Sequence, residues 1–286
     1  MTDIHRVRVP VRWVDLDAQD SLPQRWANDA VILDYLQEAR VDFLLRGPNA
    51  HLLGGGVIVV AHQVEYLAPI RSGTEHVEVG LSVADVGAAR FTVGYRVHAG
   101  GERVARARTL LCNYDFATQR PARWTDAERA WFAERSVPLE QFRDVGAFEV
   151  GERYHRHSFV VRWSDMDAYG HANNTRFYDY VAEARVRTLG VPSHGSAWLV
   201  VRQDMRYVGQ IEHRLEPYEV HTAVAALGRT SATLAVHIVD PSSGRLLAHA
   251  TTVLVHADGE GHPQPLPDAV REAYGRWPAK PKKGNR

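Results

Sequence analysis

The 286-residue chain is poor in cysteine: its single thiol, Cys112, cannot form a disulfide within the chain. Cys112 lies in a largely apolar, strand-like run, where we expect a buried small side chain rather than a nucleophile. The sequence also lacks any run near the roughly 18 apolar residues of a membrane-spanning helix, and its start has no apolar core of signal-peptide type. We therefore expect a protein of the reducing cytoplasm without membrane insertion.

A net charge of one sign is missing too. The formal net charge is +0 at pH 7, so no overall field attracts nucleic acid or an anionic membrane. Lysine occurs only at positions 280, 282 and 283, among Pro, Gly and Asn, which predicts a disordered basic tail. No P-loop, dinucleotide fingerprint or G-x-S-x-G elbow is present, and Gly54–Gly56 leads into a strand rather than a helix.

What the chain does contain is an internal repeat. Val11–Ala18 (V-R-W-V-D-L-D-A) and Val161–Ala168 (V-R-W-S-D-M-D-A) are identical at six of eight positions. Asn28–Val41 and Asn173–Val186 share seven of fourteen. Self-similarity of this kind indicates two copies of one structural unit.

The copies differ in the turn between these two blocks. Copy two has the short turn Y-G-H-A after its second aspartate, whereas copy one carries five extra residues and reads Asp20–Ala27, D-S-L-P-Q-R-W-A. The Pro and Trp of this insertion would reshape any pocket there. We expect one working site, in copy two.

Each copy has the same predicted order of elements. A strand leads into the D-x-D turn, and a helix follows with apolar residues at i, i+3, i+4, i+7 and i+11. These stripes are Ile32, Tyr35, Leu36, Ala39 and Phe43 in copy one, and Phe177, Tyr180, Val181, Ala184 and Thr188 in copy two. Strand-like segments with short connections then predict an antiparallel meander in which neighbours in sequence pair.

The predicted domain limits follow from this order. Residues 1–116 form the first unit, with the disrupted turn, and residues 152–266 form the second, with the intact motif. Residues 117–151 form a linker with a short helix near Asp126–Phe132. Residues 267–286 contain a last short helix, near Asp268–Arg276, and the disordered basic tail.

Arg162–Asn174 (R-W-S-D-M-D-A-Y-G-H-A-N-N), followed by Glu183-Ala-Arg185, resembles the hotdog-fold superfamily of 4-hydroxybenzoyl-CoA and acyl-CoA thioesterases. The duplication resembles the double-hotdog thioesterases, which include plant acyl-ACP thioesterases. The resemblance implies an α+β fold of tandem hotdog units, each an antiparallel sheet wrapped around one long central helix. It also implies active sites between units and chemistry without a cofactor or metal ion.

The resemblance matches Asp167 to the catalytic carboxylate, acting as base or nucleophile just before a helix whose first amides could hold an oxyanion. His171 could orient that carboxylate or contact the thioester, or merely bond to the turn backbone. Of Asn173 and Asn174 we expect one to cap the helix and the other to donate to substrate, and we choose Asn173 as donor because Asn28 repeats it. For Asp165 we favour a structural role.

Several further residues are secondary candidates for the site. Asp17 is the copy-one counterpart of Asp167 and belongs to a possible second site. Glu183 and Arg185 recur as Glu38 and Arg40, and we expect them to lock the helix against the sheet rather than to take part in chemistry. By the family geometry, His62, Gln63 and Glu65 form the surface of copy one that faces the substrate. Asp165, Asp167 and His171 have the side chains of metal ligands, but we predict no metal site.

The sequence therefore predicts an acyl-thioester hydrolase, with acyl-CoA as substrate and no other cofactor. Acyl-ACP is the alternative substrate. A non-catalytic acyl-CoA-binding protein is the alternative of another class, and a hydratase of the same fold ranks last because its histidine motif is missing. A monomer, as a pseudo-dimer of the two copies, and a homo-oligomer both remain open.

Overall fold

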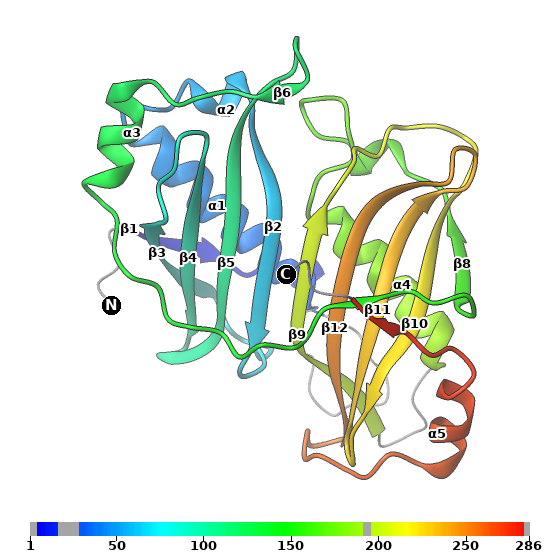
Figure 1. Cartoon of the computed structure of the whole chain (residues 1–286). Helices are drawn as coiled ribbons and strands as arrows, with labels where there is room; N and C mark the ends of the chain where they lie inside the picture. The colour runs from blue at the N-terminus through cyan, green and yellow to red at the C-terminus, as the bar shows by residue number, and fades with distance from the viewer. Residues whose placement is uncertain (1–4, 17–28, 191–195, 283–286) are drawn as a thin grey trace. The chain divides into compact units, whose positions relative to one another are not determined.

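The computed structural model describes residues 5–16, 29–190 and 196–282. The chain divides into two compact units, with the boundary after Arg143. Each unit is an antiparallel sheet with one long helix against it, so the predicted tandem hotdog fold is confirmed (Figure 1). The insertion of copy one and Asp17 lie outside the described residues.

Unit 1 follows the predicted order of elements. It contains β1 (His5–Pro10), a 3-10 turn (Trp13–Asp15), α1 (Val31–Leu45), α2 (Leu52–Gly55), β2 (Val57–Tyr66), β3 (His76–Ala84), β4 (Arg90–Ala99), β5 (Glu102–Asp115), β6 (Arg120–Pro121) and α3 (Asp126–Ala133). The order across the sheet is β1-β3-β4-β5-β2, and β6 adds to β5.

Unit 2 repeats this order. It contains β7 (Phe148–Glu149), β8 (His155–Phe159), a 3-10 turn (Trp163–Asp165), α4 (Arg176–Leu189), β9 (Ser196–Tyr207), β10 (Tyr218–Leu227), β11 (Ser231–Asp240), β12 (Arg245–Asp258), α5 (Asp268–Tyr274) and β13 (Lys280–Pro281). The main sheet of this unit has the order β9-β12-β11-β10-β8, and β13 pairs with β7 in a separate two-stranded ladder.

The strand order departs from a simple meander. β3, β4 and β5 are neighbours, but β2 pairs with β5 rather than with β3, and β1 takes the place beside β3. The prediction that every strand pairs with its neighbour in sequence is therefore wrong for β2, and for its counterpart β9. The connections after these strands, residues 67–75 and 208–217, are long enough to reach the far side of the sheet.

The two helices present the predicted faces to their sheets. All five residues of each stripe are buried. Burying one large apolar side chain contributes about 1.5–3 kcal/mol, so these faces hold each helix in the concave side of its sheet. Cys112 is buried in β5, as expected for a small apolar side chain.

The predicted linker and tail belong to the two units. α3 and the following segment pack on unit 1, where Phe132 stacks on Phe91 at 4.1 Å between ring centroids. Lys280 and Pro281 pair with β7, so the prediction of a disordered tail is wrong as far as Lys282. Backbone pairing and ion pairs hold these residues, and composition alone could not reveal such partners.

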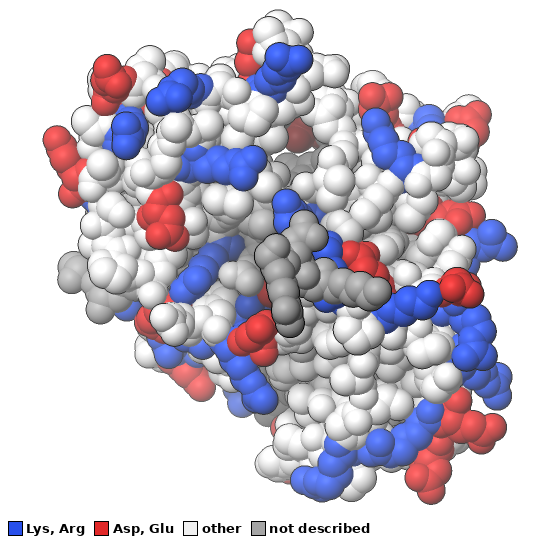
Figure 2. Space-filling model, in the orientation of Figure 1, with Lys and Arg blue, Asp and Glu red and all other residues white. Residues whose placement is uncertain are grey.

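Charges of both signs are interspersed on the face drawn in Figure 2, as the zero net charge implies. Among the described residues, no helix is long and apolar enough to cross a membrane.

Candidate active site

The site predicted in copy two is built on a tight turn before α4. Met166 and Ala172 form an isolated antiparallel bridge, and the N–H of Asp167 donates to the carbonyl of His171 at 2.8 Å. Gly170, whose N–H donates to the carbonyl of Asp167 at 3.1 Å, has a φ of 79°. Only glycine adopts this left-handed conformation readily, so the G of the motif allows the chain to reverse here.

The turn holds the carboxylate of Asp167 through one oxygen. Oδ1 accepts the N–H of Tyr169 at 2.8 Å and, more weakly, the N–H of His171 at 3.5 Å. Burial, with the nearby charge of Asp167, raises the pKa of Tyr169. Asp167 is half-buried, so its carboxylate is oriented by backbone amides while part of it still reaches the surface.

Asp165 has a different role. Its Oδ2 accepts the N–H of Arg162 and the hydroxyl of Tyr180, both at 2.9 Å. Burial, with the bond to Asp165, raises the pKa of Tyr180 far above its ordinary value, so this hydroxyl stays a donor. The carboxylate thus joins the turn to α4, in agreement with a structural role.

The same pair of hydrogen bonds to the first aspartate occurs in unit 1. Oδ2 of the buried Asp15 accepts the N–H of Arg12 at 2.8 Å and the hydroxyl of Tyr35 at 2.9 Å. The sequence pointed to both tyrosines only as members of an apolar stripe. Their repetition with the first aspartate was the signal that sequence reasoning missed.

Asn173 occupies the start of α4. Its Oδ1 accepts the N–H of Thr175 at 3.0 Å, and its carbonyl accepts the N–H of Arg176 at 2.9 Å. These two amides are therefore already bonded, which corrects the expectation that the first helical amides as a group face the substrate. The carbonyl of Asn174 accepts the hydroxyl of Tyr207 at 2.9 Å. Asn173 thus closes the turn just before α4, whose N-cap residue is Thr175 without a side-chain cap bond, and Nδ2 of Asn173 carries the donors of its side chain.

Glu183 does not lock α4 to the sheet. It pairs with Arg187 at 3.0 Å on the same helix, with side chains 52% and 64% exposed, so that expectation is wrong for Glu183. A pair of this kind on a helix surface contributes only about 0.3–0.5 kcal/mol. In unit 1 the buried Arg40 does connect helix to sheet, because its guanidinium donates to the hydroxyl of Tyr95 at 3.2 Å.

The three residues expected to form one wall in copy one lie on two faces of β2. His62 is buried and its Nδ1 lies 2.8 Å from Oγ1 of Thr109, whereas Gln63 and Glu65 alternate to the other face. Glu65 accepts from Arg106 at 2.5 Å. His62 therefore cannot share a surface with Gln63 and Glu65, and a contact of any of them with substrate stays a prediction.

His171 and the residues of copy one stay predictions as well. The backbone of His171 closes the turn, and the role expected for its imidazole remains to be tested. Asp17 and Asn28 lie outside the described residues. Among the described residues, one group has the side chains and the spacing to hold a metal ion: Glu149, His237 and His249, which sequence reasoning missed because they come from three separate strands.

The architecture matches solved structures over nearly its whole length. A protein from Lactobacillus plantarum, described provisionally as an oleoyl thioesterase, has a TM-score of 0.72 at 14% identity and covers 92% of this chain and 97% of its own. The 12:0-ACP thioesterase of Umbellularia californica has a TM-score of 0.69 at 15% identity, with 87% and 96% covered. An acyl-ACP thioesterase from Bacteroides thetaiotaomicron has 0.66 at 12%, with 87% and 96%. At these identities the similarity shows the fold.

A comparison with curated proteins found no match. The family model described as the thioesterase-like superfamily matches residues 9–132 and 161–274. These two segments take in most of both repeats, including the D-x-D turn and the helix of each. The chain therefore belongs to the thioesterase-like superfamily, and this membership supports thioester hydrolysis as its class of activity.

Proposed function

We propose that the protein hydrolyses acyl-CoA thioesters, with Asp167 as the catalytic carboxylate. The observation that carries this proposal is that the two aspartates of the D-x-D motif have different hydrogen-bond partners. Asp165 is committed to Tyr180 and Arg162, whereas Asp167 is fixed by the turn at the entrance to α4. A carboxylate held in place by backbone amides is oriented for use as a base or nucleophile.

Two routes are consistent with this placement. As a general base, Asp167 takes a proton from water, the resulting hydroxyl adds to the thioester carbonyl, and collapse of the tetrahedral oxyanion expels the CoA thiolate, which is then protonated. As a nucleophile, its carboxylate adds to the same carbon and expels the thiolate, giving a mixed anhydride that water hydrolyses. Both routes develop negative charge on the former carbonyl oxygen.

Asn173 and the start of α4 are suited to stabilise that charge. Because Oδ1 of Asn173 is fixed by the N–H of Thr175, the orientation of the side-chain amide is set, and Nδ2 is the group that can donate to the oxyanion. The dipole of α4 adds positive potential at the same end. We assign His171 to orienting the thioester or its leaving group.

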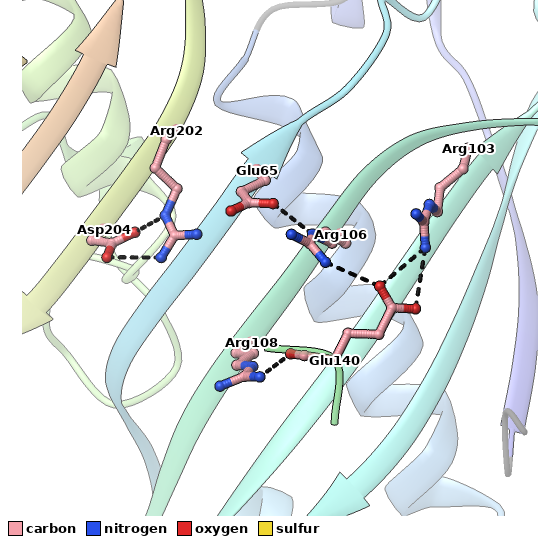
Figure 3. A network of polar contacts seen from close by, with 7 residues as sticks. All are labelled: Glu65, Arg103, Arg106, Arg108, Glu140, Arg202 and Asp204. Atoms are coloured by element: carbon pink, nitrogen blue, oxygen red, sulfur yellow. Dashed lines mark hydrogen bonds and ion pairs between the residues drawn. The ribbon is translucent and has the colours of Figure 1, made fainter. Parts of the chain in front are cut away.

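Acyl-ACP is the alternative substrate, and the full-length similarity to two ACP thioesterases favours it. Docking an acidic carrier protein calls for open arginine side chains. The arginines that gather on the sheet of unit 1 are instead paired with Glu140 and Glu65 (Figure 3). That compensation of charge argues against an ACP-docking surface on this face of unit 1. We also propose a cytoplasmic location, where both carriers occur.

The test is release of free thiol from a panel of short, long and aromatic acyl-CoAs, with the same acyl groups on ACP for comparison. Wild type is compared with Asp167→Asn and with the matched variant of copy one, Asp17→Asn. We expect Asp167→Asn to lower turnover by roughly 10²–10⁴ and Asp17→Asn to spare it. Turnover on ACP alone would transfer the proposal to the other carrier. Acyl-CoA binding without turnover on either carrier would favour a non-catalytic binding protein.

A further inference from the structure

A second group of chemically competent side chains lies on the other face of the sheet of unit 2. His237 of β11 and His249 of β12 are direct cross-strand partners. Val236 and Ile238, on either side of His237, are buried toward α4, so the two imidazoles point to the opposite face. β7 crosses that face, with its partner β13 (the red arrow in Figure 1), and brings Glu149 over the histidines.

The distances within this group suit a shared cation. Oε2 of Glu149 lies 3.0 Å from Nε2 of His237 and 3.8 Å from Nδ1 of His249, and one ligand atom from each residue lies within 4.8 Å of the others. Ligands at about 2.0–2.1 Å from a tetrahedral zinc ion are separated by roughly 3.3 Å. The two measured distances lie on either side of this value.

The contact between His237 and Glu149 leaves the ring nitrogen without a well-formed hydrogen bond. Nε2 of His237 is buried and has no hydrogen-bond partner among the described residues, although the carboxylate oxygen is only 3.0 Å away.

The surroundings of these three side chains lower the pKa of each. Burial, helped by the neighbouring His249, lowers the pKa of His237 to about 4, and burial also lowers the pKa of His249. Neutral imidazole is the form that offers a lone pair to a metal ion. Burial acts to raise the pKa of Glu149, but Lys282, 2.8 Å from Oε1, outweighs it, so the carboxylate is ionised.

Lys282 is compatible with a cation at this place because it contacts only the other carboxylate oxygen. It pairs with Oε1, and Oε2 faces the imidazoles. An outer partner of this kind orients a ligating carboxylate. The next histidine in the same row, His221, has other partners: Nε2 lies 2.8 Å from Glu219, and its ring stacks on Tyr154.

We propose that Glu149, His237 and His249 bind a zinc ion, with water completing the tetrahedron. Imidazole nitrogen with one carboxylate is a donor set that zinc accepts, whereas magnesium and calcium prefer oxygen ligands alone. The ion joins β7, and through it β13, to β11 and β12. It acts as a structural clip on the face of the sheet that lies away from α4 and Asp167.

The experiment uses untagged full-length protein, stripped with EDTA and dialysed, and measures zinc uptake by calorimetry. We expect one equivalent to bind to wild type. Glu149→Gln and His249→Gln should each weaken binding at least roughly tenfold, since loss of an outer partner alone costs about 10–100-fold. Cobalt should give the visible absorption of a tetrahedral site in wild type and lose it in both variants.

Two controls make the result specific. His221→Gln removes a histidine from the same row, and Glu140→Gln removes the carboxylate that pairs with arginines in unit 1; both should bind zinc as wild type does. The near-isosteric Glu149→Gln, checked for an unchanged melting temperature in EDTA, guards against loss by misfolding. The proposal is overturned if wild type takes up no zinc, or if Glu149→Gln and His249→Gln bind it with wild-type affinity.

Discussion

The outer faces of the two sheets carry the same arrangement with different chemistry. In unit 1 Arg96 and Arg106 are cross-strand partners, and Glu140 pairs with Arg106 at 3.1 Å and with Arg96 at 3.7 Å (Figure 3). In unit 2 His237 and His249 are cross-strand partners, and Glu149 lies over both. In each unit a glutamate from outside the repeated strands covers one pair of basic residues on β4–β5 or β11–β12.

The difference shows how one scaffold supports two kinds of contact. Guanidinium groups are charged at every accessible pH and have no lone pair to offer, so the arrangement around Glu140 is a permanent ion-pair network. Imidazoles are neutral when buried and do offer a lone pair, so the arrangement around Glu149 gains little from charge and can take a metal ion. Replacing arginine by histidine at two equivalent strand positions changes an electrostatic clamp into a candidate ligand set.

The largest expected effect is the difference in kcat between variants of the two aspartates of the intact turn. Asp167→Asn should lower kcat by roughly 10²–10⁴, the range lost with a general acid or base, at an unchanged melting temperature. Asp165→Asn should retain most of kcat but unfold at lower temperature, because its bond from Tyr180 loses a charged acceptor. Thiol release and thermal unfolding on the same samples check both. Equal losses of kcat would contradict the division of roles.

A second comparison concerns the tyrosine that binds the first aspartate of each copy. Tyr35→Phe should cost about 1.5–3 kcal/mol of unfolding free energy, since it removes a hydrogen bond to a charged group. Asp15 is 3% exposed, whereas Asp165 is only half-buried, so water can replace the lost hydroxyl in unit 2 and Tyr180→Phe should cost less. Urea unfolding of both variants measures this; a larger loss for Tyr180→Phe would reverse the order.

Much of the fold was predictable because it rests on local patterns. The repeat gave two units, and the stripes at helical spacing gave both long helices with their buried faces. The position of β2 beside β5 was not predictable, because strand order depends on which edge a nine-residue connection reaches. The partner of Lys280 was hidden for a similar reason: β7 lies more than a hundred residues earlier in the chain.

The candidate site, like the fold, was predictable from the sequence only where it rests on local patterns. The motif placed Asp165 and Asp167 in one continuous turn, where the structure gives the two carboxylates different partners, and the catalytic role of Asp167 stays a prediction. His62, Gln63 and Glu65 were grouped by family geometry against the alternation of a strand, which places neighbours on opposite faces. Glu149, His237 and His249 come together only through the register of β11 with β12 and the path of β7. No sequence spacing contains that information.

The pH dependence of stability should distinguish the two outer faces. His237 has a pKa of about 4 in the folded chain against 6.5 in the unfolded chain, so its contribution is present above pH 6.5 and is lost as the pH falls toward 4. Burial acts to raise the pKa of Glu140, but the arginines outweigh it and the net shift is downward from 4.5, so the loss in unit 1 begins only at lower pH. Melting temperatures in EDTA from pH 7 to 4 should therefore fall less steeply for His237→Asn than for wild type. His221→Gln is the control, and a slope unchanged in His237→Asn would contradict the assignment.

The smallest expected effect compares two buried threonines in the sheets. Oγ1 of Thr109 lies 2.8 Å from Nδ1 of His62, whereas Thr252 and its cross-strand neighbour Gln203 have Oγ1 and Nε2 without hydrogen-bond partners among the described residues. Thr109→Val should cost about 1 kcal/mol, the net value of one hydrogen bond together with the histidine left behind. Thr252→Val should be neutral or stabilising, because it removes a buried hydroxyl that gains nothing. Urea unfolding of both variants decides between the two, and an equal cost would contradict the assignment of Thr252 as a buried hydroxyl without a hydrogen bond.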